Sequence, residues 1–228
     1  MSDTVLYAAP GTCARVPAIV LEEMGIPFET RVIRFMRGEH KSPEYKAHNP
    51  KGKVPALIVD GVTLTENVAI INYLNETRPD ARVLPKAVGP YEKAVQTADL
   101  CFCSSTLHPL VTRIRMPQLF AGPENMRAVW TAGCEAMKEY FGLVEARLAD
   151  QPWWFGEAWS AMDAYLYWIF WRVNGASFPT ADFPRFSDQA ARMEERPAVQ
   201  RAVAREAEMT KQLEAEGLDF TPPPLPPA

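Results

Sequence analysis

The chain has 228 residues, of which 47% are hydrophobic and 23% are charged, and its formal net charge is −4. This is the composition of a folded globular protein, with enough residues for one large domain or two modest ones. The negative charge and the scattered placement of lysine and arginine exclude nucleic acid and an anionic membrane surface as expected partners.

The first part of the chain, residues 1–83, predicts a mixture of strands and helices. The expected order is strand, helix, strand, irregular stretch, strand, strand, helix. In the same order, these elements cover residues 5–7, 12–24, 28–33, 37–50, 54–59, 62–64 and 68–76. A crossover between the first two strands implies a parallel pair, and Asp60-Gly61 predicts a hairpin turn and an antiparallel pair. We therefore expect a mixed sheet flanked by helices.

The second part of the chain predicts helices alone. Residues 84–90 have turn residues and little periodicity, so they are interpreted as a linker. The helical domain is expected over residues 91–216. Its helices are predicted at residues 91–120, 124–150, 160–173, 187–196 and 198–216. Residues 217–228 are too rich in proline for a helix and are expected to be extended or disordered.

Secretion, membrane insertion and metal binding are not expected. Residues 1–4 lack the basic and apolar regions of a signal peptide, and no apolar stretch approaches the roughly 18 residues that span a bilayer. The four cysteines contain no Cys-x-x-Cys pair, and the three histidines are scattered. These features predict a soluble cytoplasmic protein without a structural metal.

Four short segments carry the functional information. They are Pro-Gly-Thr-Cys at residues 10–13, N-P-K-G-K-V-P-A-L at 49–57, L-T-E-N-V-A-I at 64–70, and G-E-A-W-S-A-M-D-A at 156–164. In this order, over nearly the whole chain, they resemble the glutathione S-transferase family, and most closely its bacterial, beta-like or theta-like members. The resemblance implies the glutathione transferase fold: an α/β thioredoxin-like N-terminal domain followed by an all-α C-terminal domain. It also implies a homodimer.

The turn at Pro10-Gly11 directs the start of a helix toward whatever binds there. A helix N-terminus has free N–H groups and roughly half a positive charge, so it favours an anion such as a thiolate. Lowering the pKa of a glutathione thiol by about two units corresponds to about 2.7 kcal/mol, and a helix dipole supplies only part of this. A hydrogen-bond donor is therefore needed as well, and Thr12 and Cys13 are the two candidate catalytic residues.

The resemblance assigns the rest of the glutathione site residue by residue. Val54-Pro55 matches the family's cis-proline segment, whose first residue binds the cysteinyl backbone of glutathione. Glu66 would pair with the γ-glutamyl ammonium, and the helix N-terminus at Asn67 would receive its carboxylate. Asn67 stands where the family usually has serine, but asparagine is an equally good helix cap.

Four more residues are assigned, two to the glutathione site and two to the helical domain. Lys53 and His48 are candidates for binding the glycyl carboxylate of glutathione. Ser160 and Asp163 are interpreted as a capping box that helps the helical domain to fold, outside the site.

The identity of the catalytic group remains open at this stage. Tyr7 is expected to be a core residue of the first strand. Thr12 matches the position used by serine-type enzymes, and Cys13 matches the cysteine of bacterial Pro-Gly-x-Cys members. The helix N-terminus should lower the pKa of Cys13, which would favour thiol–disulfide exchange or removal of glutathione from a conjugate.

In the helical domain, His108, Arg113 and Arg115 are candidate substrate-binding residues, the arginines for an acidic group. Pro109 and Pro117 are expected to kink their helix, and most of the aromatic residues at 153–171 are expected to form the core. The sequence thus predicts a glutathione transferase acting in detoxification, which joins glutathione as co-substrate to a small hydrophobic electrophile. The alternatives are a glutathione-dependent thiol lyase or disulfide oxidoreductase using Cys13, and a non-catalytic ligand-binding protein.

Overall fold

The computed structural model describes residues 3–222, which form two compact units. The first unit contains the chain up to Leu84 together with Glu194–Phe220, and the second contains Pro85–Met193. The proline-rich segment expected at the end of the chain lies outside the described residues from position 223 onward.

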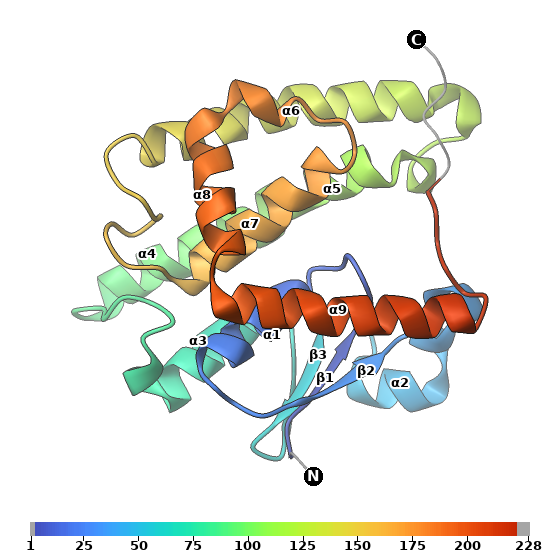
Figure 1. Cartoon of the computed structure of the whole chain (residues 1–228), viewed down its shortest axis with the longest axis horizontal. Helices are drawn as coiled ribbons and strands as arrows, with labels where there is room; N and C mark the ends of the chain where they lie inside the picture. The colour runs from blue at the N-terminus through green and yellow to red at the C-terminus, as the bar shows by residue number, and fades with distance from the viewer. Residues whose placement is uncertain (1–2, 223–228) are drawn as a thin grey trace. The chain divides into compact units, whose positions relative to one another are not determined.

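The first unit is built on a four-stranded mixed sheet with the strand order β2-β1-β3-β4. Figure 1 labels the first three of these strands, β2, β1 and β3. The strands are β1 (Val5–Ala8), β2 (Glu29–Val32), β3 (Ala56–Val59) and β4 (Val62–Thr65). Strands β1 and β2 are parallel, whereas β3 runs antiparallel to both β1 and β4. The predicted mixed sheet is confirmed.

A tight hairpin joins β3 to β4 at the predicted Asp-Gly turn. Asp60 and Gly61 have φ angles of 51° and 77°, so both central residues are left-handed. This is the backbone of a type I′ turn, which suits the twist of two antiparallel strands and favours Asp-Gly.

Three α-helices are described in the thioredoxin-like part of this unit: α1 (Arg15–Glu23), α2 (Pro43–His48) and α3 (Asn67–Thr77). Helix α2 was not expected, because residues 37–50 were predicted to be irregular. Ser42 caps it by accepting a hydrogen bond from the Tyr45 N–H at 3.2 Å, and Pro43 occupies the first turn. A serine followed by proline is a helix-start signal, and it was missed because the segment is so polar.

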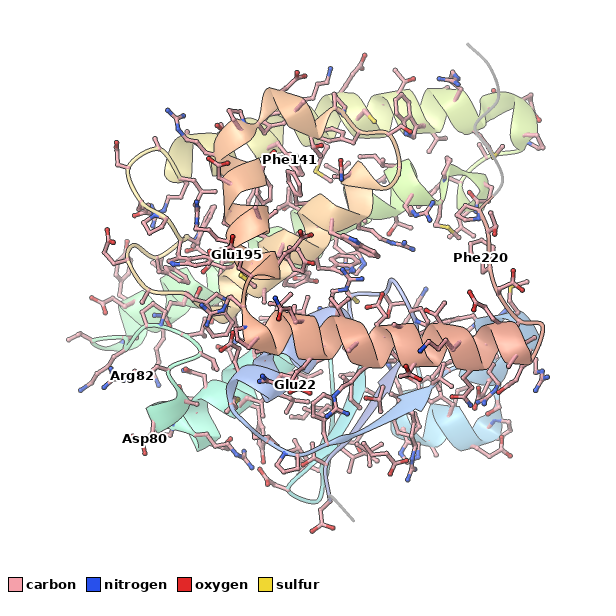
Figure 2. The ribbon with its side chains drawn as sticks, viewed as in Figure 1. Glu22, Asp80, Arg82, Phe141, Glu195 and Phe220 are labelled. Carbon is pink, nitrogen blue, oxygen red and sulfur yellow. The ribbon has the colours of Figure 1, made fainter. Side chains whose placement is uncertain are left out.

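The last helix, α9 (Pro197–Ala215), lies along α1 in the first unit (Figure 1). This differs from the prediction, which placed residues 198–216 in the helical domain. Ion pairs between α1 and α9 explain why α9 lies in the first unit. Glu22, labelled in Figure 2, pairs with Arg201 at 2.6 Å and with Arg205 at 2.5 Å, and Glu23 pairs with Arg196 at 2.6 Å. These pairs join segments that are far apart in sequence, which periodicity cannot reveal.

The second unit is helical throughout its regular structure. Its α-helices are α4 (Pro90–Cys101), α5 (His108–Arg115), α6 (Met126–Arg147), α7 (Ala161–Asn174) and α8 (Pro184–Glu194). Phe141 of α6, labelled in Figure 2, lies at the centre of an aromatic core. Its ring contacts those of Phe170, Phe178, Phe183 and Phe186.

Helices α4 and α5 are joined by one turn of π-helix at Phe102–Leu107, within the segment predicted as a single helix. Pro109 has no N–H and its ring interferes with the preceding turn, so the regular α-helical ladder cannot continue through it. A widened π turn is one way for a helix to accommodate this interruption.

Helix α7 is the central element of the second unit, because every residue from Ala161 to Phe170 is buried. Its start is fixed by the predicted capping box. The Asp163 carboxylate accepts hydrogen bonds from the Ser160 N–H at 3.0 Å, the Ser160 hydroxyl at 2.8 Å and the Trp154 N–H at 2.8 Å. The structural interpretation of Ser160 and Asp163 is confirmed.

Within residues 3–222, no helix has both the length and the apolar character that a membrane span requires. The same residues contain no group of three or more histidine, cysteine or acidic side chains arranged to hold a metal ion.

Candidate functional site

The turn between β1 and α1 holds the two candidate catalytic residues. Gly11 has a φ angle of 71°, a conformation that glycine adopts without steric cost. The Thr12 N–H bonds the carbonyl of Ala9 at 3.2 Å, and the Arg15 N–H bonds the carbonyl of Thr12 at 3.2 Å. Helix α1 therefore begins at Arg15, and Thr12 and Cys13 lie in the turn before it.

Two backbone donors of this turn take no part in the backbone hydrogen bonds of the described residues. Among the described residues, the N–H groups of Cys13 and Ala14 have no backbone acceptor, whereas those of Thr12 and Arg15 are bonded. Unpaired N–H groups at a helix start, reinforced by the helix dipole, form an anion-binding site. The turn can therefore receive a thiolate through its backbone.

The hydroxyl group of Thr12 is already engaged. It donates a hydrogen bond to the carbonyl of Ala9 at 2.6 Å. To donate to a bound thiolate, the hydroxyl would have to give up this bond. Through this hydrogen bond to Ala9, Thr12 helps to hold the turn closed.

Cys13 does not have the lowered pKa expected of it. The thiol is half-buried and lies 3.6 Å from the carbonyl oxygen of Val54. Burial is the largest cause that raises the pKa of Cys13 to about 12, and the negative charge of Glu66 raises it further. Its own N–H and the Asn67 side chain act in the opposite direction but are outweighed. The prediction failed because it counted the helix dipole and omitted desolvation.

This pKa predicts a slow reaction of Cys13 with iodoacetamide. Only the thiolate reacts, so at neutral pH alkylation should be at least about a hundredfold slower than for a cysteine of ordinary pKa. Mass spectrometry of the Cys13 peptide from folded and denaturant-unfolded protein would measure both rates. A folded-state rate that levels off near pH 7 would contradict the raised pKa.

A second segment, residues 49–57, is held rigidly beside the turn. The Lys53 carbonyl accepts hydrogen bonds from the Tyr45 hydroxyl at 2.5 Å and from the Asn49 amide at 2.6 Å. The Val54–Pro55 peptide bond is cis, as the resemblance implies. Val54 precedes the first paired residue of β3, Ala56, so its backbone lies outside the sheet and next to the Cys13 sulfur.

The third segment contributes Asn67, but not as the expected cap. Helix α3 begins at Asn67 itself, and Glu66 occupies the capping position. The buried Asn67 amide donates to the Cys13 carbonyl at 3.0 Å, so it ties α3 to the turn between β1 and α1. Its side-chain oxygen is buried and has no hydrogen-bond partner among the described residues. An unpaired buried acceptor of this kind is costly unless a ligand donor reaches it.

Glu66 has an unusual backbone, with φ 72° and ψ 126°. A non-glycine residue in such a conformation is held there by its surroundings, and such residues concentrate at ligand sites. Its exposed carboxylate pairs with the Lys51 ammonium at 2.5 Å, and Lys51 also donates to the Thr65 hydroxyl at 2.9 Å. Sequence reasoning missed Lys51, although it lies within the 49–57 segment.

The two residues proposed for the glycyl carboxylate differ in position. The Lys53 side chain is exposed. His48 lies at the end of α2 and stacks on the Tyr7 ring, with 5.0 Å between ring centres. Tyr7 is a buried strand residue, as predicted. His40, which lies near Lys53, was not singled out from the sequence. Burial and the neighbouring positive charges of Lys41, Lys53 and Lys46 lower the pKa of His40.

The second unit contains the other candidates, all on α5. His108 Nδ1 lies 3.3 Å from the Tyr165 hydroxyl, and its ring packs edge-on against Trp168. Arg113 is exposed and covers the Phe120 ring. Arg115 is half-buried, burial lowers its pKa, and its buried Nε has no partner among the described residues.

Two family models match the chain. Residues 11–77 match the glutathione S-transferase N-terminal domain, and residues 127–205 match the glutathione S-transferase C-terminal domain. Glutathione S-transferase GstA from Escherichia coli O157:H7 is 30% identical over 203 residues, which cover 88% of this chain and 98% of that protein.

Two further similarities extend this result. The maleylacetoacetate isomerase maiA from Aspergillus fumigatus is 31% identical over 84% of this chain and 85% of its own length. A crystal structure of a Sulfitobacter glutathione transferase homologue with bound glutathione covers 92% of this chain and all of its own, with a TM-score of 0.78 at 27% identity.

Proposed function

Because this chain belongs to the glutathione S-transferase family, we propose that it joins glutathione to a small hydrophobic electrophile. The observation that carries the proposal is the convergence of three segments of the first unit on one turn. Cys13 lies between the Val54 carbonyl and the Asn67 amide, beside two N–H groups that have no backbone acceptor within residues 3–222.

The segments around the turn fit the parts of glutathione. The cysteinyl backbone would pair with the backbone of Val54, which lies outside the strand pairing of β3, and this would bring the thiol to the start of α1. The γ-glutamyl ammonium of glutathione would displace Lys51 from the exposed Glu66 carboxylate. The γ-glutamyl carboxylate would bind at the N-terminus of α3. Lys53 would face the glycyl carboxylate. The buried Asn67 oxygen, which has no hydrogen-bond partner in the described part of the chain, supports a polar ligand here.

Activation of glutathione is assigned to the backbone of the turn. The N–H groups of Cys13 and Ala14 are fixed before the ligand arrives, so they stabilise a thiolate without reorganisation. The Cys13 thiol is protonated because its pKa is about 12, and it would have to give up its hydrogen bond to the Val54 carbonyl before it could donate to the bound sulfur. Thr12 holds the turn closed. A thiol lyase or disulfide oxidoreductase mechanism would require a Cys13 thiolate, which burial disfavours.

A second candidate function is glutathione-dependent isomerisation of an acidic substrate. It is favoured by the similarity to maleylacetoacetate isomerases and by Arg115, a half-buried cation whose Nε lacks a partner within residues 3–222. Arg115 would bind a substrate carboxylate, and His108 and Arg113 remain candidates on the same helix. The homodimer, the cytoplasmic location and the role in detoxification are also proposed, on the resemblance alone.

Two assays test the proposal. Isothermal titration should show saturable binding of glutathione, and a chloronitrobenzene substrate should be conjugated at a rate that saturates with glutathione. Maleylacetoacetate offered with glutathione separates the second candidate, because only an isomerase returns glutathione unchanged. Binding without either reaction would contradict the catalytic assignment and support a ligand-binding protein.

A further inference from the structure

A buried carboxylate reaches the catalytic turn from the opposite end of the sequence. Glu206 of α9 accepts a hydrogen bond from the Gly11 N–H at 2.7 Å, across 195 positions of sequence. Glu206 and Gly11 belong to the same unit of the structure, and Glu206 is only 9% exposed. None of the roles proposed above for residues 49–57 and 64–70 requires a buried carboxylate beside Gly11.

The carboxylate has a matched partner. Arg15, the first residue of α1, donates from Nε to Oε2 of Glu206 at 2.9 Å and from Nη2 to Oε1 at 2.7 Å. The Arg15 side chain is 3% exposed. This two-pronged geometry is the strong form of the arginine–carboxylate pair, and removing either partner would leave a buried charge unpaired.

We propose that Glu206 and Arg15 are positioning residues for the activation of glutathione. The bond to Glu206 holds Gly11 in its left-handed conformation, and Gly11 orients the next N–H groups, those of Cys13 and Ala14. The inference rests on the proposed function, in which these two groups stabilise the thiolate.

Arg15 neutralises the charge of Glu206. Without Arg15, a carboxylate next to the anion site would raise the pKa of a thiol bound there. The guanidinium cancels that charge and leaves Oε1 as an acceptor for Gly11. The pair therefore fixes the turn without opposing the thiolate.

The test compares two double variants that differ only in the acceptor. Arg15→Met/Glu206→Gln removes the ion pair but keeps an oxygen for the Gly11 N–H. Arg15→Met/Glu206→Met removes the ion pair and the acceptor. The readouts are the pKa of the bound glutathione thiol, measured by ultraviolet thiolate absorbance, and the separate changes in kcat and in KM for glutathione.

We expect the Gln variant to bind glutathione with the wild-type thiol pKa. The Met variant should raise that pKa by about one unit, which means about tenfold less thiolate at a pH below it. The loss should appear in kcat more than in KM. Glu22→Gln is the matched control, because it breaks ion pairs between the same two helices and should lower Tm without changing the thiol pKa.

Amide hydrogen exchange of Gly11 in the protein without glutathione separates this inference from the proposed function. Protection in wild type and in the Gln variant, and its loss in the Met variant, would support the positioning role even if glutathione failed to bind. If the Met variant does not fold, Glu206→Asp withdraws the carboxylate by one methylene and should raise the thiol pKa in the same direction. An unchanged thiol pKa or equal Gly11 protection in the acceptor-free variant would overturn the inference.

Discussion

Replacing Asp163 by alanine is expected to lower the free energy of unfolding by about 3–5 kcal/mol. The carboxylate is buried and accepts hydrogen bonds from the N–H groups of Trp154 and Ser160 and from the Ser160 hydroxyl. Alanine would leave these donors buried without an acceptor, at about 1–3 kcal/mol for each N–H group. It would also remove the cap of the most buried helix in the second unit.

Denaturant unfolding of wild type and Asp163→Ala would measure the loss. Asp188→Ala is the matched control, because Asp188 lies exposed on α8 and should change stability by less than about 0.5 kcal/mol. A loss of similar size in both variants would contradict the capping role.

The size of this loss should depend on pH. Burial is the main cause that raises the pKa of Asp163 to about 6, against the opposing hydrogen bonds from Trp154 and Ser160. Between about pH 4 and pH 6 the folded state holds more protons at this group than the unfolded state, so its contribution to stability falls as the pH rises. The difference between wild type and the alanine variant should therefore shrink over this range. A difference that grows with pH would contradict the raised pKa.

Replacing Gly52 by alanine is expected to cost about 3 kcal/mol and to weaken glutathione binding at least about tenfold. Gly52 has a φ angle of 62°, and a Cβ atom placed there would lie 2.6 Å from the backbone oxygen of His40. The left-handed conformation alone costs alanine about 1 kcal/mol. The overlap cannot be relieved by turning a side chain, so the backbone beside Lys53 and Val54 must move.

Gly61→Ala provides the matched control for Gly52→Ala. Gly61 is also left-handed, with a φ angle of 77°, but a Cβ atom there would have no neighbour within 4 Å among residues 3–222. The Gly61→Ala variant should lose about 1 kcal/mol of the free energy of unfolding and keep the wild-type Kd for glutathione. Calorimetry and denaturant unfolding of both variants would separate backbone conformation from the overlap, and equal losses would contradict the account.

The local features of this fold were readable from the sequence because each depends on neighbouring residues. The Asp60-Gly61 hairpin follows from two residues that tolerate positive φ angles. The capping box at Ser160 and Asp163 joins positions three residues apart. The cis bond at Val54–Pro55 came from the resemblance, since most bonds preceding proline are trans.

The features that were missed depend on distant contacts or on burial. The position of α9 is set by ion pairs of Glu22 and Glu23 with arginines more than 170 positions away. The raised pKa of Cys13 comes mainly from desolvation, which has no sequence signal. Asn67 was expected to cap its own helix, but its amide instead reaches the Cys13 carbonyl in a different segment.

We propose that the backbone of the Gly11–Ala14 turn, and not a Cys13 thiolate, activates glutathione. Conjugation of a chloronitrobenzene by wild type, Thr12→Ala and Cys13→Ala, with disulfide reduction measured on the same preparations, tests this proposal. We expect Cys13→Ala to retain conjugation within about tenfold of wild type, because this substitution leaves the backbone N–H groups in place. Loss of conjugation by a thousandfold or more in Cys13→Ala, or a strong disulfide reductase activity that disappears with it, would show that Cys13 itself is the activating group.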